Sequence, residues 1–258
     1  MNGRHRLFVA CTVMVAVVAA LAPQTAHAYR PFDGTDADVA KPGEFELELG
    51  PAHFYREDGS NFLVTPATVL NLGVVDRLEL VADFKNFVAL DEPEANAHRL
   101  RLRDTDLLAK IVLRKGTLQE RGGPSVALES GVLLPEPGAS NGFGTQANVI
   151  VSLTSASVAL HLNEAIAINR DHRFEDFTGA IVEIGRRLVV RPVAEVFADR
   201  AVGGGSEYSV LAGALWAVSE TWVLDAALRA ARASGASVVE VRLGVTWTAH
   251  VWRVQTSE

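Results

Sequence analysis

Polar and apolar residues alternate along most of the chain beyond its first 42 positions. Residues 44–49 read Glu-Phe-Glu-Leu-Glu-Leu, so an extended strand there places three carboxylates on one face and three apolar side chains on the other. The pattern recurs near the carboxyl end, where odd positions from Val239 to Trp247 are apolar and the even positions between them are polar or small. One face of such a strand needs water, and the other needs lipid or an apolar core.

The alternation predicts twelve strands, and their connections differ in character on the two sides. Polar or Gly/Pro-rich loops fall at every second junction, with tight turns between them. The junction at residues 115–123 is an exception, because it is long where a tight turn is expected. Short turns on one rim and longer loops on the other are typical of a bacterial outer-membrane barrel. The predicted strands lie near residues 43–56, 60–74, 77–88, 100–114, 124–134, 145–154, 158–168, 177–186, 188–198, 206–218, 221–231 and 236–248.

Aromatic residues gather near the predicted strand ends, as in the girdles of barrels in lipid. Trp216, Trp222 and Trp247 fall at ends that adjoin tight turns. Two prolines, Pro66 and Pro192, lie inside predicted strands and cannot donate a ladder hydrogen bond, so a bulge or bend is expected at each. The ends that adjoin the longer loops carry Phe54, Tyr55, Phe62, Phe84, Phe87, Phe143, Phe174, Phe177, Phe197 and Tyr208.

We therefore predict an all-β fold, an antiparallel transmembrane β-barrel of about twelve strands over residues 43–258. The alternative is a soluble antiparallel sandwich or lipocalin-like barrel, in which the same alternation puts a core inside and water outside. Strand lengths of about 10 or more residues, charge-poor apolar faces and the difference between the rims favour lipid.

The first 28 residues are predicted to be a cleavable signal peptide. Arg4 and Arg6 precede an apolar stretch of 16 residues, 7–22, and Ala-His-Ala at 26–28 fits a cleavage site. Because a bilayer span requires ~20 residues, an uncleaved anchor is less favoured. Residues 29–42 then form an expected N-terminal periplasmic segment, and the predicted location is the outer membrane. The only cysteine, Cys11, lies within the signal, which leaves no thiol for a disulfide, a zinc site or a nucleophile.

The net charge excludes one class of partner. Without Arg4 and Arg6, 22 basic side chains face 31 acidic ones, a net charge of −9. Nucleic acid requires a basic face, so no nucleic-acid partner is expected. The expected partners are outer-membrane lipid and a small-molecule solute, and the sequence does not indicate an oligomeric state.

If the polar faces point inward, one set of mostly charged residues lines a common lumen. Such charges could favour permeation of cations or neutral solutes, or they could brace the lumen through salt bridges. The candidate lumen-lining residues are Glu44, Glu46, Glu48, Glu79, Asp83, Asp106, Lys110, Glu129, His161, Glu183, Glu195, Glu240 and Arg242.

Metal, cofactor and catalytic sites are not predicted. His161 stands alone between two leucines, and His172 lies in a polar loop without a second histidine at ligand spacing. Ser140 opens a Ser-Asn-Gly sequence similar to part of an outer-membrane phospholipase motif, but glycine occupies the position of its histidine. Three glycines at 203–205 precede no helix and so form no phosphate site. The chain is therefore not expected to be an enzyme.

Several short motifs resemble the MetA-pathway of phenol degradation family. Residues 30–38, Arg-Pro-Phe-Asp-Gly-Thr-Asp-Ala-Asp, and 41–48, Lys-Pro-Gly-Glu-Phe-Glu-Leu-Glu, are similar to its opening. Residues 71–80 and 104–110 resemble later strands. Leu-Leu-Pro at 133–135 and Leu-His-Leu-Asn at 160–163 follow in the family's order, so the resemblance covers most of the mature chain. It implies an outer-membrane barrel with a transport role.

Three hypotheses follow. The first is a channel or facilitator for passive diffusion of small molecules, hydrophobic or aromatic ones among them. The second is a plugged structural or binding barrel that conducts nothing. The third is a soluble periplasmic barrel that binds an apolar ligand.

Overall fold

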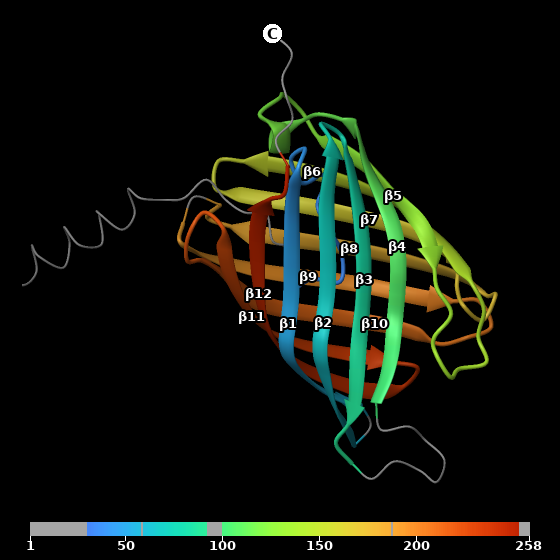
Figure 1. Cartoon of the computed structure of the whole chain (residues 1–258). Helices are drawn as coiled ribbons and strands as arrows, with labels where there is room; N and C mark the ends of the chain where they lie inside the picture. The colour runs from blue at the N-terminus through green and yellow to red at the C-terminus, as the bar shows by residue number, and fades with distance from the viewer. Residues whose placement is uncertain (1–29, 58, 92–99, 187, 253–258) are drawn as a thin grey trace, which may run out of the picture.

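Twelve strands form a closed antiparallel barrel in the computed structural model of the chain, which describes residues 30–57, 59–91, 100–186 and 188–252 (Figure 1). Each strand pairs with its sequence neighbours, and β1 closes the barrel by pairing with β12. The fold prediction is confirmed, and each predicted strand overlaps one in the structure. The strands are β1 (Glu44–Glu57), β2 (Ser60–Val75), β3 (Leu78–Ala89), β4 (Leu100–Arg114), β5 (Ser125–Leu133), β6 (Gly144–Ser155), β7 (Val158–Ile168), β8 (Phe174–Ile184), β9 (Val190–Ala201), β10 (Ser206–Ala217), β11 (Trp222–Ala233) and β12 (Ala236–His250).

The alternation of each strand separates an outer apolar surface from a polar lumen. In β12, Val239, Val241 and Leu243 are exposed outside, while Glu240 and Arg242 are buried inside. An apolar outer surface on a closed barrel is suited to contact with lipid. The closed ladder also leaves no edge strand with unpaired backbone groups. No helix among the described residues is long and apolar enough to cross a bilayer.

The two rims differ only in part as predicted. The rim where β1 begins and β12 ends, here called the terminal rim, carries tight connections such as that between β6 and β7. The opposite rim, here called the distal rim, carries the longer connection between β5 and β6 but also a tight turn between β11 and β12. The predicted loop at 91–94 lies largely outside the described residues, as do the predicted turn residue Arg187 and the predicted signal peptide.

A proline-associated irregularity crosses neighbouring strands. The pairing of β2 with β3 shifts register between Val64 and Ala67, around Pro66, which confirms the expected bulge. Pro66 cannot donate to the ladder, and its carbonyl accepts a 3.4 Å bond from Asn86 Nδ2. Pro192 differs, because it pairs with Ala214 of β10 without a shift.

The aromatic residues at the distal rim divide between the two faces of the wall. Phe54, Phe143, Phe174 and Tyr208 are exposed on the outside. Assigning all ten distal aromatics to a lipid girdle was wrong, because strand parity and not closeness to the rim decides the direction of a side chain. Four of the ten line the lumen instead, namely Tyr55, Phe87, Phe177 and Phe197.

Candidate functional site

The segment before β1 lies inside the barrel. Residues 30–42, here called the plug, donate backbone N–H groups to lumen side chains of strands far away in the sequence. The N–H groups of Asp33 and Gly34 bond the Glu195 carboxylate at 2.9 and 2.7 Å, and that of Ala40 bonds Glu79 at 2.5 Å. The prediction of a periplasmic segment did not foresee this placement, because the segment lacks alternation and only lumen contacts on other strands position it.

Further contacts hold the middle of the plug. The backbone N–H and carbonyl of Thr35 bond the Asn163 side chain at 3.1 and 2.9 Å, and the Ala37 N–H bonds Ser152 Oγ at 2.9 Å. Where the plug returns to the wall, a Cβ on Gly73 would collide with plug carbonyl oxygens. Glycine at that position therefore lets two backbones approach closely.

Apolar contacts add to these bonds at two places. Phe32 packs against Val193, Leu215 and Val223 on the lumen faces of β9, β10 and β11. Ala37 packs in a second cluster with Leu118, Ala127 and Ile150. Burial of these side chains stabilises the plug inside the barrel, since apolar burial contributes about 25 cal/mol per Å².

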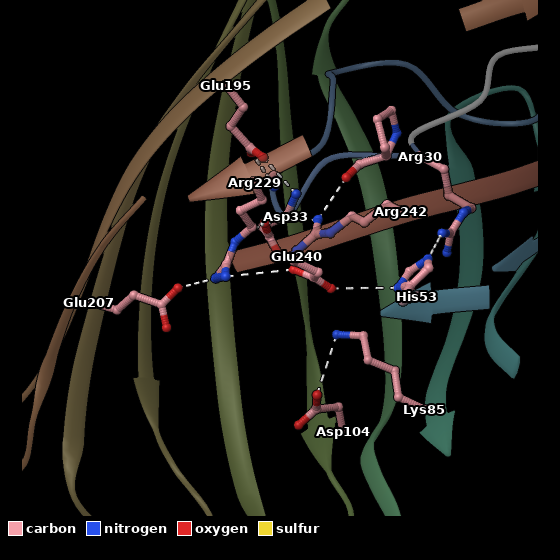
Figure 2. A network of polar contacts seen from close by, with 12 residues as sticks. Arg30, Asp33, His53, Lys85, Asp104, Glu195, Glu207, Arg229, Glu240 and Arg242 are labelled. Atoms are coloured by element: carbon pink, nitrogen blue, oxygen red, sulfur yellow. Dashed lines mark hydrogen bonds and ion pairs between the residues drawn. The ribbon is translucent and has the colours of Figure 1, made fainter. Parts of the chain in front are cut away.

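An ion-pair network joins the plug to β11 and β12, and Figure 2 shows its side chains converging on Asp33. Arg242 lies 3.0 Å from Asp33 and 2.8 Å from Glu240, and it donates to the Pro31 carbonyl at 2.7 Å. Arg229 contacts Glu207 and lies 3.6 Å from both Asp33 and Glu240. Each carboxylate or guanidinium therefore has a charged partner, which buried charges require.

Asp33 is the carboxylate at the centre of this network. Burial raises the pKa of Asp33, but the Arg242 and Arg229 guanidinium groups lower it by more, to about 2. Asp33 therefore stays ionised at any physiological pH and keeps both arginines bound to the plug.

Arg30 anchors the start of the plug to β1 and β11. Its backbone N–H bonds Glu48 at 3.1 Å, its guanidinium contacts His53, and its Nε lies 3.7 Å from Asp225. His53 lies in turn 3.7 Å from Glu240 (Figure 2). This cluster connects the first plug residue to the network around Asp33.

The buried side chain of Lys110 connects β4 to the plug. Its side chain is 1% exposed; its Nζ bonds Thr35 Oγ1 at 3.0 Å and lies 3.7 Å from Glu79, whose side chain is 0% exposed. Glu79 and Glu129 are its cross-strand neighbours on β3 and β5. A lysine between two carboxylates offsets charges that would otherwise be buried alone.

His161 lies in a buried relay of polar contacts. Its Nδ1 lies 2.8 Å from Ser152 Oγ and its Nε2 lies 3.5 Å from Glu183, which pairs with Arg191 at 3.3 Å. The residue types match a serine, histidine and acid triad, but Ser152 is fully buried and its oxygen accepts the Ala37 N–H. The arrangement therefore holds the plug in place.

The long connection at 115–124 also serves the plug. It contains a short 3₁₀ turn, η1 (Thr117–Gln119), which turns inward so that Leu118 packs against Ala37. Gln119 Nε2 donates to the Ala37 carbonyl at 3.0 Å and to Asp38 Oδ1 at 2.9 Å. The loop is long because it supports the plug at the terminal rim.

A cavity of about 790 Å³ remains between the plug and the distal rim. Its floor includes Arg30, Asp33 and Thr35 of the plug, and its wall is a mixture of charged and aromatic side chains. On one side the ring centroids of Tyr55 and Phe87 lie 6.2 Å apart. On another side the ring centroids of Phe177 and Phe197 lie 5.1 Å apart.

The candidate lumen residues occupy three places in the structure. Seven line the cavity: Glu48, Asp83, Asp106, Lys110, Glu129, Glu240 and Arg242. Four bind the plug or belong to the relay beside it: Glu79, Glu195, His161 and Glu183. The remaining two lie near the terminal rim, where Glu46 accepts a bond from Thr248 at 3.3 Å and Glu44 lies 3.7 Å from His250.

Several residues of the site were not predicted from the sequence. Arg229 and Asp225 share the parity of inward positions on β11, so extending the same alternation would have found them. Lys85 follows Asp83 by two positions and could have been found likewise. The plug residues and Gln119 carried no such signal. Among the described residues, no group of three or more His, Cys, Asp or Glu side chains is arranged to hold a metal ion.

Comparisons with known proteins identify similar folds but no family. The sequence matches no protein-family profile. No curated protein matches it either. The structure is similar to the COG4313 outer membrane channel from Pseudomonas putida F1, with a TM-score of 0.63 and 9% identity over 84% of this chain and 100% of that one.

A second similar structure is the KdgM porin, solved in complex with disordered oligogalacturonate. It has a TM-score of 0.53 and 10% identity over 80% of this chain and 99% of that one. Identities this low show a shared fold, a barrel of the outer-membrane type.

Proposed function

We propose that the protein is an outer-membrane channel through which small molecules diffuse passively, hydrophobic or aromatic ones among them. The cavity of about 790 Å³ inside a closed barrel carries the proposal. A barrel of this size is wider than the side-chain-filled eight-stranded case, and its wall offers both charged and aromatic contacts. The outer apolar surface would contact outer-membrane lipid, with the terminal rim in the periplasm.

In this proposal, the plug is the barrier that a solute must pass. A solute entering from the distal rim reaches the cavity and meets a floor made by Asp33 and its neighbours. Passage to the periplasm then requires local displacement of residues 30–42. The short motifs at 30–48 and 71–80 support membership of the MetA-pathway of phenol degradation family.

A plugged barrel that conducts nothing is the second candidate. The density of plug contacts favours it, since hydrogen bonds join five plug residues to four side chains of the wall, namely Glu195, Asn163, Ser152 and Glu79. Each net bond contributes about 0.5–1.5 kcal/mol, so together they could hold the plug permanently.

Fractionation and liposome swelling test the proposal together. Recovery in the outer membrane with a heat-dependent gel shift is expected for a folded barrel. Liposomes containing the purified barrel should then swell in small neutral sugars and aromatic alcohols at a rate proportional to protein. Swelling no faster than in protein-free liposomes, with the gel shift intact, would establish the plugged barrel instead. Recovery in the soluble periplasm would overturn the membrane location.

A further inference from the structure

The cavity wall carries more acid than base. Among the described residues that line it, twelve are Asp or Glu and seven are Lys or Arg, a formal excess of five negative charges. Most of the cations are committed to partners within the wall. Lys85 pairs with Asp104 at 3.3 Å, and Arg170 pairs with Asp106 at 2.5 Å. A charged solute entering the cavity therefore meets a field that favours cations.

Two of these acids lie near each other on one side, on β8 and β9. Glu175 and Asp199 both line the cavity, and no described basic side chain forms an ion pair with either. Glu175 accepts a 2.9 Å bond from the neutral Asn169 amide. A third acid, Glu207, is the cross-strand partner of Asp199 and is bound to Arg229.

Aromatic rings lie directly beside these two acids. Phe177 is the cross-strand partner of Asp199, and Phe197 precedes Asp199 by two positions on the same face of β9. The guanidinium of Arg229 already lies 5.3 Å from the centre of the Phe197 ring. This pair of rings therefore lies in a setting that accepts a positive charge.

A buried polar group on the adjacent strand also lacks a partner. Ser209 follows Glu207 by two positions on the lumen face of β10 and is the cross-strand partner of Phe197. It is 5% exposed, and its Oγ has no hydrogen-bond partner among the described residues. Ser209 is not among the residues that line the cavity, so its hydroxyl neighbours the site and is not assigned a contact with the ligand.

We propose that this wall binds small organic ammonium ions that carry an aromatic or other apolar group. The ammonium would lie at Asp199 and Glu175, and the apolar group would contact Phe177 and Phe197. Carboxylates combined with aromatic faces recognise such cations, because the ring quadrupole and the charges attract the same group. The proposal rests on the proposed function in that it names the solute class the channel cavity prefers.

Equilibrium binding to the folded barrel in detergent tests the proposal without requiring conduction. The probes are 2-phenylethylammonium and the similarly sized anion 3-phenylpropanoate, titrated by calorimetry. The cation is expected to bind roughly tenfold more tightly, as a charge-assisted contact would give. Equal affinities, or tighter binding of the anion, would overturn the proposal.

Matched variants locate the site. Asp199→Asn combined with Glu175→Gln should remove the preference, while Asp176→Asn should leave it, because Asp176 faces outward on the same strand and pairs with Arg200. Loss of preference in Asp176→Asn alone would contradict the placement. The gel shift confirms that each variant is folded.

Reversal potentials in planar bilayers separate this proposal from the channel function. A barrel that binds the cation but passes no current would refute the channel and leave the binding site standing. A barrel that conducts 2-phenylethylammonium and 3-phenylpropanoate equally, without preferential binding, would refute the cation site and leave the channel standing.

Discussion

The two halves of the lumen are built from the same alternating strands but differ in content. Toward the terminal rim, polar side chains such as Glu195 and Asn163 bond the plug backbone. Toward the distal rim, acids and rings such as Asp199 and Phe177 face an open cavity. The difference arises from thirteen residues before β1 and one inward loop, because the wall has the same architecture throughout. The lumen of such a barrel is therefore closed by what the chain places inside it.

The largest expected effect comes from removing a buried cation in the plugged half. Lys110→Met leaves Glu79 and Glu129 without their lysine, and breaking a buried pair in this way costs ~3–5 kcal/mol. Lys85→Met is the matched change in the open half, where the Lys85 side chain is 34% exposed and an exposed pair contributes ~0–1 kcal/mol. Urea unfolding of the liposome-folded barrel measures both free energies, and equal losses would contradict the contrast.

Loosening the plug should have the next largest effect. Arg242→Met removes contacts with Asp33, Glu240 and the Pro31 carbonyl. Because both carboxylates keep Arg229 as a partner, we expect a net loss comparable to one charged hydrogen bond, about 1.5–3 kcal/mol. Hydrogen exchange of residues 30–40, followed by mass spectrometry, should become faster. Arg200→Met is the control, because Arg200 pairs with Asp176 on the outside; it should leave exchange in the plug unchanged. Unchanged exchange in Arg242→Met would show that the network does not hold the plug.

A smaller effect is expected from the loop at the terminal rim. Gln119→Glu replaces the amide that donates to the Ala37 carbonyl and to Asp38 with a carboxylate that can only accept. Exchange should increase near residues 36–40 and less so near residue 33. Glu120→Gln, an exposed neighbour, provides the control. Uniform exchange along the plug in both variants would mean that the loop does not support it.

The last prediction is that the contribution of Asp33 to stability does not change between pH 5 and pH 8. Because the pKa of Asp33 is lowered from 3.8 to about 2, its stabilising contribution is complete above its ordinary pKa and is lost only as the pH falls through about 2. The stability difference between Glu195→Gln and Glu195→Gln combined with Asp33→Asn should therefore be the same at pH 5 and pH 8, because the glutamine cannot ionise and still offers an acceptor to the Asp33 N–H. Unfolding at both pH values measures this difference, and one that shrinks at pH 5 would place the pKa of Asp33 much higher.

Strand number and the direction of most side chains could be predicted, because a period of two is a local property. The inward set that includes Glu48, Lys110 and Arg242 follows from that period alone. The same rule was not applied to Phe177 and Phe197, which were assigned to a girdle by their closeness to a rim. The alternation of side chains along each strand would have directed Phe177 and Phe197 into the lumen, whereas Phe174 and Tyr208 point outward.

The plug could not be predicted from local pattern. Gly34 and Glu195 are 161 positions apart, and nothing in residues 30–42 alternates. The loop at 115–123 was recognised as unusually long, but its reason became visible only with the contact between Leu118 and Ala37. Contacts of this kind depend on closure of the barrel, which brings distant strands around one short segment.

The most direct test compares the single-channel conductance of the full chain with that of a variant lacking residues 30–40, both in planar bilayers. The account predicts a conductance several times larger without the plug, since the plug lies across the lumen between the cavity and the terminal rim. Both proteins must show the heat-dependent gel shift of a folded barrel. Equal conductance in two folded barrels would contradict the claim that this segment closes the lumen.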